Sequence, residues 1–392
     1  MSDDRPTCRH FGRCGGCTGL DVPIDVQLAR KRERAARVLA PFLGDVALAL
    51  DPPPRPPRLD RMKLLYPAQP GPGGELVAGL YARGSHELVE IEECQVQARA
   101  LTLLAQRVAA ILRAHGSVPY DESTGAGWLR ALHARIAPGT GELLVGLVTA
   151  HATPPAPRTV AAVVEACHGL PRATRASVHL VGLVQNVNPR PGNALLGDAL
   201  VTLHGRDHQF DRADGLTFRV GFLSFYQVHR HAAALLFRPA LAMLGDVRGL
   251  RAIDGYGGVG SFALRLAAAG ARRVDLVEAS ASACADARAS AETNALAERV
   301  AVHQGPFAAV DLPGGADVVV VDPPRAGLGS EGVARVLRHD APRVLYVSCS
   351  VDSLARDLAG LAERYRVRAA RLCDLFPHTE HVETVLLLER AG

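Results

Sequence analysis

The sequence predicts an α/β protein, with a doubly wound parallel sheet in its C-terminal half and a mixed α+β region before it. From about residue 229, short Val-rich runs alternate with helical segments, which is typical of buried parallel strands joined by helices. Residues 59–220 instead indicate short strands separated by turns, with antiparallel character. Two final strands near 366–373 and 382–389, with no helix between them, predict an antiparallel addition at one edge of the C-terminal sheet.

Length and composition are those of a globular protein. With 392 residues, 48% of them hydrophobic, the chain is long enough for one very large domain or about two to three ordinary ones with proper cores. No run approaches roughly 18 apolar residues and the N-terminus is polar, so we expect neither a membrane span nor a signal peptide, and a cytoplasmic protein. The net charge of +4 is compatible with a nucleic-acid partner but is weak support alone.

Three domains are expected, at 1–58, 59–220 and 221–392. The first combines a cysteine-containing segment, a helix from Pro23 to about Leu39, and the proline-rich linker DPPPRPPR, which excludes a helix or a central strand. One face of the helix could meet phosphate, although a solvated helix face is the simpler interpretation. That face carries Arg30, Lys31, Arg34 and Arg37.

The individual elements follow from the alternation of apolar runs with Gly-, Pro- and Asn-rich turns. In the mixed region we expect strands at 61–66, 76–81, 87–91, 129–136, 143–149 and 178–186, helices at 96–114 and 158–169, and short strands over 195–220. In the C-terminal half we expect strands at 250–254, 273–278, 300–303, 318–322 and 343–348, and helices at 230–244, 260–269, 280–295, 329–338 and 351–363.

Three of the eight cysteines lie within the first 17 residues, as Cys8, Cys14 and Cys17 in CRHFGRCGGC. Thiolates spaced C-x5-C-x2-C and separated by glycines can fold around one soft metal centre, because glycine permits tight turns. A fourth ligand is needed, and Cys94 is the best candidate in the next region. The spacing leaves both a zinc site and an iron–sulfur cluster open.

Two motifs follow predicted strands of the C-terminal half. The segment 253–262, IDGYGGVGSF, places a glycine turn between a strand and a helix, and Glu278 ends the next strand, where a carboxylate can hold ribose hydroxyls. Together they suggest S-adenosylmethionine more than NAD. In VDPPRAG, the proline pair gives the chain a rigid exit that can hold Asp322 beside a cofactor or base. Amino-group methyltransferases carry an aromatic residue after such a pair, so Arg325 argues against methylation of an exocyclic nitrogen.

Cys349 lies at a strand end in YVSCS, next to a predicted helix N-terminus that would stabilise a thiolate. A lone buried cysteine is more often a packed small hydrophobe, but Cys349 shares its predicted sheet edge with the two motifs above. The segment 376–383, FPHTEHVE, gathers two histidines and two carboxylates, which favours acid–base chemistry over a zinc site. In the aromatic bridge GFLSFYQV, Gln227 could bind a ligand or a base edge, and hydrophobic packing is the alternative for the bridge.

In this order, DGYGGVGSF, VDPPRAGL, YVSCS and FPHTEHVE resemble motifs of the S-adenosylmethionine-dependent RNA uracil-C5 methyltransferases, which form 5-methyluridine. The resemblance covers almost the whole chain and includes SFYQV and SVHLVGLVQNVNPRPGN. CRHFGRCGGC with Cys94 is similar to the iron–sulfur site of the ribosomal RNA branch, whereas the transfer-RNA branch generally lacks these cysteines. Only seven residues precede Cys8, so no RNA-binding TRAM domain is expected there, as in the shorter 23S rRNA type.

The resemblance implies a Rossmann-like class I methyltransferase domain at 221–392, an RNA-binding role for 59–220, and a monomer that acts on 23S rRNA. It makes Cys349 the nucleophile and Glu383 the base. The implied residues of the S-adenosylmethionine site are Gln227, Tyr256, Glu278 and Asp322, and the implied ligands of a 4Fe-4S cluster are Cys8, Cys14, Cys17 and Cys94. The chain departs from the family pattern at His229, where Asn is usual, at Gly257, where Cys is usual, and at Gly305-Pro306, where Asp is frequent.

Methylation of uracil at C5 requires the same groups: a nucleophile, a base and a methyl donor. Uracil C5 is a poor nucleophile, and thiolate attack at C6 makes it an enolate carbon that can accept a methyl group. A base must then remove the C5 proton so that β-elimination releases the thiolate, and the uracil must leave its stack to be reached. Methylation of transfer RNA is one alternative, and a non-catalytic RNA-binding or redox-responsive protein is another. The intact set of Asp322, Cys349 and Glu383 argues against the latter.

Overall fold

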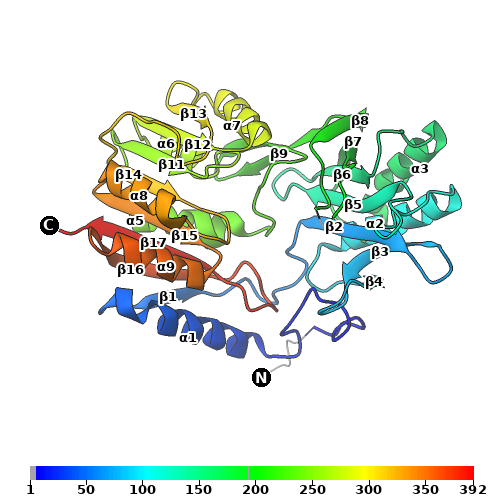
Figure 1. The fold of residues 1–392 in the computed structure, drawn as a ribbon, viewed down its shortest axis with the longest axis horizontal. Helices are drawn as coiled ribbons and strands as arrows, with labels where there is room; N and C mark the ends of the chain where they lie inside the picture. The colour runs from blue at the N-terminus through cyan, green and yellow to red at the C-terminus, as the bar shows by residue number, and fades with distance from the viewer. Residues whose placement is uncertain (1–5, 193) are drawn as a thin grey trace.

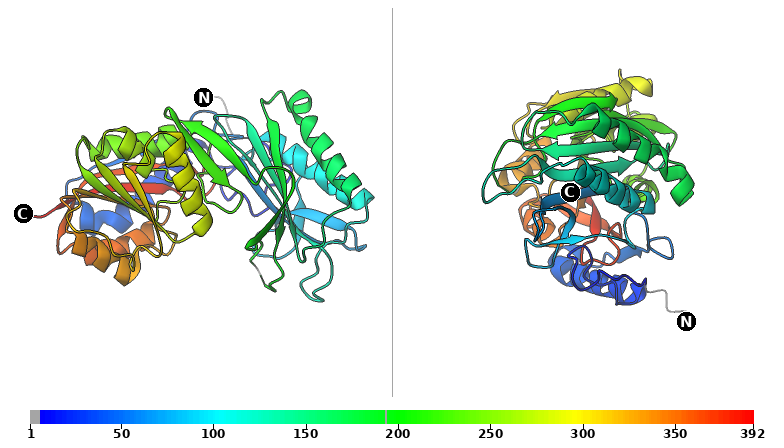
Figure 2. Two further views of the ribbon diagram at one scale, coloured as in Figure 1. Left: turned by 90° about the horizontal axis from the view of Figure 1, so that it is seen from above. Right: turned by 90° about the vertical axis from the view of Figure 1, so that its right-hand side faces the viewer.

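The computed structural model describes residues 6–192 and 194–392, and in this part of the chain two large β-sheets lie side by side (Figure 1). The eight-stranded sheet has the order β1-β16-β17-β15-β14-β11-β12-β13, and the seven-stranded sheet has the order β4-β3-β2-β5-β6-β7-β8. Seen from above, the green segment with the hairpin of β9 (His208–Ala213) and β10 (Leu216–Gly221) lies between them (Figure 2). Among the described residues, no helix is both long enough and apolar enough to cross a membrane.

The eight-stranded sheet contains the predicted doubly wound core. Its strands are β1 (Leu48–Asp51), β11 (Arg251–Gly255), β12 (Arg273–Glu278), β13 (Val300–Gln304), β14 (Val318–Val321), β15 (Arg343–Ser348), β16 (Tyr365–Cys373) and β17 (Glu383–Arg390). Strands β11 to β15 are parallel, and the four valines of β14 are fully buried because helices cover both faces. The strand order reverses between β11 and β14, which is where ligands bind in open α/β sheets.

Six helices of the described chain pack on this sheet in two layers. One layer contains α5 (Arg238–Leu244), α6 (Ala263–Ala268) and α7 (Ala281–Thr293), and the other contains α1 (Ile24–Leu43), α8 (Gly329–His339) and α9 (Val351–Leu361). A single helix was predicted at 230–244, but a short π-helical turn, η1 (Ala233–Phe237), precedes α5. The antiparallel addition is present, but β17 lies inside the sheet, between β15 and β16. The parallel pairing of β1 with β16 forms the edge instead.

The N-terminal helix packs against the eight-stranded sheet. Helix α1 contacts α9 and β16, although the sequence analysis grouped it with the cysteine segment. Arg30, Arg34 and Arg37 are exposed on it, as a basic face requires. Lys31 is buried, with only 5% of its surface exposed, so its inclusion in that face was wrong.

The seven-stranded sheet forms the mixed region. Its strands are β2 (Lys63–Pro70), β3 (Leu76–Tyr81), β4 (Leu88–Glu90), β5 (Leu129–Ile136), β6 (Glu142–Thr149), β7 (His179–Val187) and β8 (Ala199–Gly205), with helices α2 (Arg99–Ala114), α3 (Pro157–His168) and α4 (Leu170–Thr174). Its neighbours pair antiparallel except β6 and β7, which are parallel. Parallel strands need a long crossover, and α3 with α4 supplies it. The predicted antiparallel character therefore describes most of the sheet but not this pair.

Candidate active site

The sheet topology brings five predicted site positions to one edge. Asp254 lies in β11, Glu278 ends β12, Asp322 follows β14 and Cys349 follows β15, and these neighbouring parallel strands end at the same side. Strand β17 runs the opposite way, and its residue Thr384 pairs with Ser348 at the end of β15. Glu383, the first residue of β17, therefore starts at the edge where Cys349 lies.

The Cys349 thiol is half-buried and lies among charged groups. Burial raises its pKa most, and the charges of Glu383 and Asp322 raise it further. The guanidinium of Arg325 opposes this shift, through its positive charge and a hydrogen bond. Helix α9 begins two residues later with Ser350 as its N-cap, so the partial positive charge of the helix N-terminus is also close. Arg325 and the helix N-terminus therefore favour the thiolate, but the net shift of the Cys349 pKa is upward.

Glu383 is a buried carboxyl group, with 3% of its surface exposed, and its Oε2 has no hydrogen-bond partner among the described residues. Burial raises its pKa most, the charge of Asp322 raises it further, and Arg325 lowers it. Burial also raises the pKa of Asp322. A buried carboxyl with a raised pKa holds and releases protons nearer to neutral pH than an exposed one, which suits proton transfer.

Hydrogen bonds hold the glycine loop to the two acidic strand ends. Oδ2 of Asp254 accepts a hydrogen bond from the backbone N–H of Ala263 at 2.8 Å, and burial raises the pKa of Asp254 to about 8. Oε2 of Glu278 accepts from the backbone N–H of Gly258 at 3.0 Å, and its Oε1 accepts from Ser280 at 2.7 Å. The Glu278 carboxylate is therefore oriented at the mouth of the loop.

Two further loop positions are sterically constrained. Tyr256 adopts a φ of 62°, in the left-handed region, and its ring lies 5.5 Å from that of Phe307. A Cβ atom at Gly257 would lie 2.4 Å from Cγ of Leu276, so this packing has no room for the cysteine usual in the family.

The aromatic bridge runs beside the glycine loop. A Cβ at Gly258 would lie 3.9 Å from the carbonyl oxygen of Phe225. Hydrophobic packing explains Phe222 and Tyr226, which are buried, but Phe225 is 63% exposed. Gln227 is half-buried and lines a cavity of about 280 Å³, but this cavity is not lined by the glycine loop, Glu278, Asp322 or Cys349. The bridge thus combines a packing function with two side chains that remain accessible.

Known proteins resemble this chain in sequence and in fold. A family model described as tRNA (Uracil-5-)-methyltransferase matches residues 314–391, which include Asp322, Cys349 and Glu383. An uncharacterised RNA methyltransferase of Halalkalibacterium halodurans is 33% identical over 97% of this chain and 82% of its own length. The chain belongs to the RNA uracil-C5 methyltransferase family. A Synechocystis RNA methyltransferase, also uncharacterised, is 32% identical over 98% of this chain and 82% of its own.

A solved structure shares the fold of this family member. It is the Pyrococcus abyssi tRNA (uracil-54, C5)-methyltransferase in complex with S-adenosyl-L-homocysteine, with a TM-score of 0.74 and 24% identity. The match covers 96% of this chain and 86% of the other. The likeness extends over both sheets, so the arrangement of the two halves is also a shared feature.

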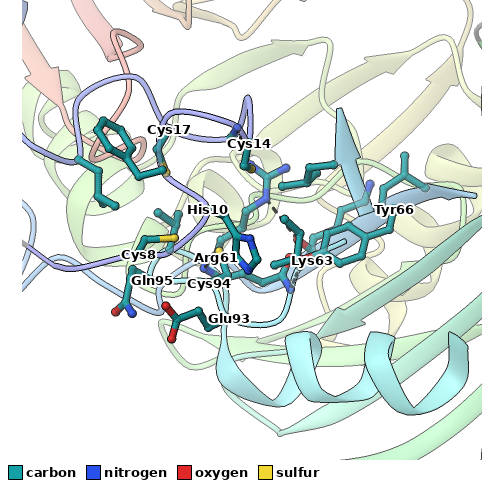
Figure 3. A pocket seen from close by; sticks show the side chains of 18 residues that line it. Cys8, His10, Cys14, Cys17, Arg61, Lys63, Tyr66, Glu93, Cys94 and Gln95 are labelled. Carbon is teal, nitrogen blue, oxygen red and sulfur yellow. Dashed lines mark hydrogen bonds between the residues drawn. The ribbon is translucent and has the colours of Figure 1, made fainter. Parts of the chain in front are cut away.

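The four predicted metal ligands of this methyltransferase line a second cavity, of about 260 Å³ (Figure 3). Cys8, Cys14 and Cys17 approach it from the N-terminal segment, and Cys94 approaches from the loop before α2. Burial and, to a smaller extent, the charges of the other three thiols raise the pKa of Cys17 to about 12. Within the described residues, no three or more His, Cys, Asp or Glu side chains form a site for a metal ion.

The structure adds residues that the sequence analysis passed over. Arg325 was considered only because it is not aromatic, yet it acts on the pKa of both Cys349 and Glu383. Its place directly after the rigid Asp-Pro-Pro segment was the available signal. Gln27 was placed on a helix without a role and Lys31 on the basic face of that helix, and both contact the loop before Glu383.

Proposed function

We propose that this methyltransferase transfers a methyl group from S-adenosylmethionine to C5 of a uridine in 23S rRNA, with Cys349 as nucleophile and Glu383 as base. The observation that carries this proposal is the position of a half-buried thiol and a buried carboxyl with a raised pKa at one sheet edge, both beside Arg325. That edge also carries the glycine loop.

Cys349 and Glu383 act in different steps of the proposed reaction. Sγ of Cys349 attacks C6 of the uracil, and the electron pair of the C5–C6 double bond moves into an enolate, which makes C5 nucleophilic. Bound S-adenosylmethionine supplies an electrophilic methyl group. Glu383 then accepts the proton from C5, the C5–C6 double bond re-forms, and the Cys349 sulfur leaves as a thiolate. Arg325 stabilises the thiolate at the start and at the end.

The cofactor site is assigned to residues around the glycine loop. The Glu278 carboxylate, oriented by Gly258 and Ser280, is suited to accept hydrogen bonds from ribose hydroxyls. Asp322, Tyr256 and Gln227 would complete the site. The buried Oδ1 of Asp254 has no partner among the described residues, which supports a ligand-facing surface at this loop.

The N-terminal cysteines are proposed to hold a 4Fe-4S cluster. Four thiols around one cavity provide one thiolate for each iron of such a cluster, which needs more space than a single ion. Arg61 and Lys63 line the same cavity, and their positive charges would offset those of the thiolates and the cluster. Anaerobic reconstitution followed by iron and sulfide determination tests this, with Cys17→Ala expected to lose the cluster. Cys167→Ala is the matched control, because Cys167 is buried in the core of the seven-stranded sheet and does not line this cavity. Stoichiometric zinc without sulfide would contradict it.

The choice of 23S rRNA over transfer RNA depends on those cysteines, because their pattern is similar to that of the ribosomal RNA branch. The family model and the solved structure both carry transfer-RNA names, so transfer RNA is the second candidate substrate. Mass spectrometric mapping of 5-methyluridine in both RNAs, with and without the gene, tests the choice. Loss of a 5-methyluridine from 23S rRNA is expected, and loss only from transfer RNA would contradict the proposal.

The catalytic assignment is tested by Cys349→Ala, which should abolish methylation of the RNA that the wild-type enzyme modifies. Cys167→Ala serves as the control. A Cys349→Ala protein with normal activity would contradict the proposed mechanism.

A further inference from the structure

The loop before Glu383 is anchored by parts of the chain more than 300 residues away. Residues 374–382 leave β16 after Cys373 and return at Glu383, and these two residues are partners across the strands. Oε2 of Glu383 has no hydrogen-bond partner among the described residues, so no hydrogen bond fixes this oxygen. Apart from the charge of Arg325, the position of the carboxyl group therefore depends on the backbone that leads into β17.

Lys31 of α1 anchors the start of the loop. Its Nζ lies 2.7 Å from Oδ1 of Asp374, and both side chains are almost fully buried. The same Nζ donates to the carbonyl oxygen of Phe376 at 3.0 Å, and the backbone N–H of Phe376 donates to Asp374. One buried ion pair thus fixes the first three loop residues against the helix.

Gln27, one turn earlier on α1, anchors the middle of the loop through His378. Its Oε1 accepts from the backbone N–H of His378 at 2.8 Å, and its Nε2 lies 3.2 Å from Nδ1 of that ring. Nε2 of His378 lies 2.9 Å from the carbonyl oxygen of Pro57, so it carries the ring proton and Nδ1 is an acceptor that faces the Gln27 amide. The two N–H groups of that amide also face the carbonyl oxygens of Gly19 and Val22, at 2.8 and 2.7 Å. Hydrogen bonds therefore fix both the backbone N–H and the imidazole ring of His378.

The cysteine segment completes this anchor. The backbone N–H groups of Thr18 and Gly19 donate to the carbonyl oxygen of His378 at 2.9 and 3.1 Å. Nε2 of Gln27 also donates to the carbonyl oxygen of Gly19 at 2.8 Å. His378 adopts a φ of 65°, a conformation that a non-glycine residue keeps only where surrounding contacts determine it. The contacts of Gln27, Thr18, Gly19 and Pro57 with His378 hold it in this conformation.

We propose that Gln27 and Lys31 are positioning residues for proton abstraction. They hold loop 374–382 and thereby set the Glu383 carboxyl at the distance from uracil C5 that proton transfer requires. This inference rests on the proposed role of Glu383. Cys349 follows a different strand, β15, and none of the anchoring hydrogen bonds involves it, so we expect the attack on C6 and the methyl transfer to depend less on this anchor than proton abstraction does. Loss of the anchor should slow the second half of the reaction and spare the first.

The test is Gln27→Met in single-turnover reactions with methyl-labelled S-adenosylmethionine and the unmodified RNA transcript that the wild-type enzyme methylates. Methionine keeps the length of Gln27 and removes its hydrogen bonds. Methyl incorporation should continue, while release of methylated RNA should slow by about 100-fold. A displacement of the reacting group by about 1 Å typically lowers the reaction rate by about this factor. A covalent protein–RNA adduct should then accumulate on denaturing gels. Glu33→Met, on the exposed face of the same helix, should release RNA like wild type.

Two further variants keep the inference testable. If Gln27→Met does not fold, Lys31→Met combined with Asp374→Asn removes both buried charges together and should give the same adduct. Release at the wild-type rate, or equal loss of methyl incorporation and release without an adduct, would overturn the inference. Glu383→Gln is run in parallel. An adduct with Glu383→Gln but not with the anchor variants refutes the positioning role alone, and no adduct with Glu383→Gln refutes the base as well.

Discussion

Replacement of Lys31 by methionine should cost more stability than removal of an exposed ion pair on the same helix. Nζ of Lys31 lies 2.7 Å from Oδ1 of Asp374, with 3% and 0% of the two side chains exposed. After Lys31→Met, the Asp374 carboxylate stays buried without a cation, and its Oδ2 already has no partner among the described residues. Such a loss typically costs about 3–5 kcal/mol in the free energy of unfolding. Lys31→Met with Asp374→Asn should recover most of it, because no buried charge remains.

The assay is urea denaturation followed by far-UV circular dichroism. Fluorescence is a separate probe, because the single tryptophan, Trp128, lies directly before β5 in the other sheet. Arg34→Met is the matched control, since the Arg34–Asp352 pair is 44% and 55% exposed and should contribute about 0–1 kcal/mol. A Lys31→Met protein within about 1 kcal/mol of wild type would refute the reasoning, as would a double variant no more stable than the single one.

Three other predictions concern the site. Because burial raises the pKa of Glu383, release of methylated RNA should rise with pH, with a midpoint above that of an ordinary carboxyl; a midpoint near pH 4 would contradict this. Glu278→Gln should weaken binding of S-adenosylhomocysteine in calorimetry by about 1.5–3 kcal/mol, through the loss of charged hydrogen bonds, and unchanged binding would remove Glu278 from the site. Gly257→Cys should lower the free energy of unfolding by about 1–3 kcal/mol, because its Cβ would overlap Leu276, and a neutral effect would show that the loop adjusts.

Much of the fold was accessible from the sequence because parallel strands buried on both faces have an unambiguous pattern. The Val-rich runs at 318–321 and 343–348 are strands at the predicted places, and their common edge follows from the alternation with helices. The insertion of β17 between β15 and β16 was not accessible. The pattern of a strand does not specify its neighbours, and β1, which is only four residues long and runs into the proline-rich stretch, is too short to be recognised.

The sequence predicted the site residues that directly follow a strand. It did not predict contacts between segments that are far apart in the sequence. The edge position of Cys349 and Asp322 followed from their place after strands. Lys31 was assigned to a basic helix face because a charged residue at helical spacing looks the same whether water or a carboxylate faces it. Its partner is 343 positions away in the sequence. The same holds for Gln27 and His378, which are separated by 351 positions.

The most direct test of the central claim is mass spectrometry of Glu383→Gln after incubation with S-adenosylmethionine and the RNA substrate. We expect a covalent adduct in which Cys349 is joined to C6 of a uracil that carries a new methyl group at C5. The adduct should be absent from the double variant with Cys349→Ala. Free 5-methyluridine at the wild-type rate, or an adduct through any other residue, would contradict the assignment of nucleophile and base.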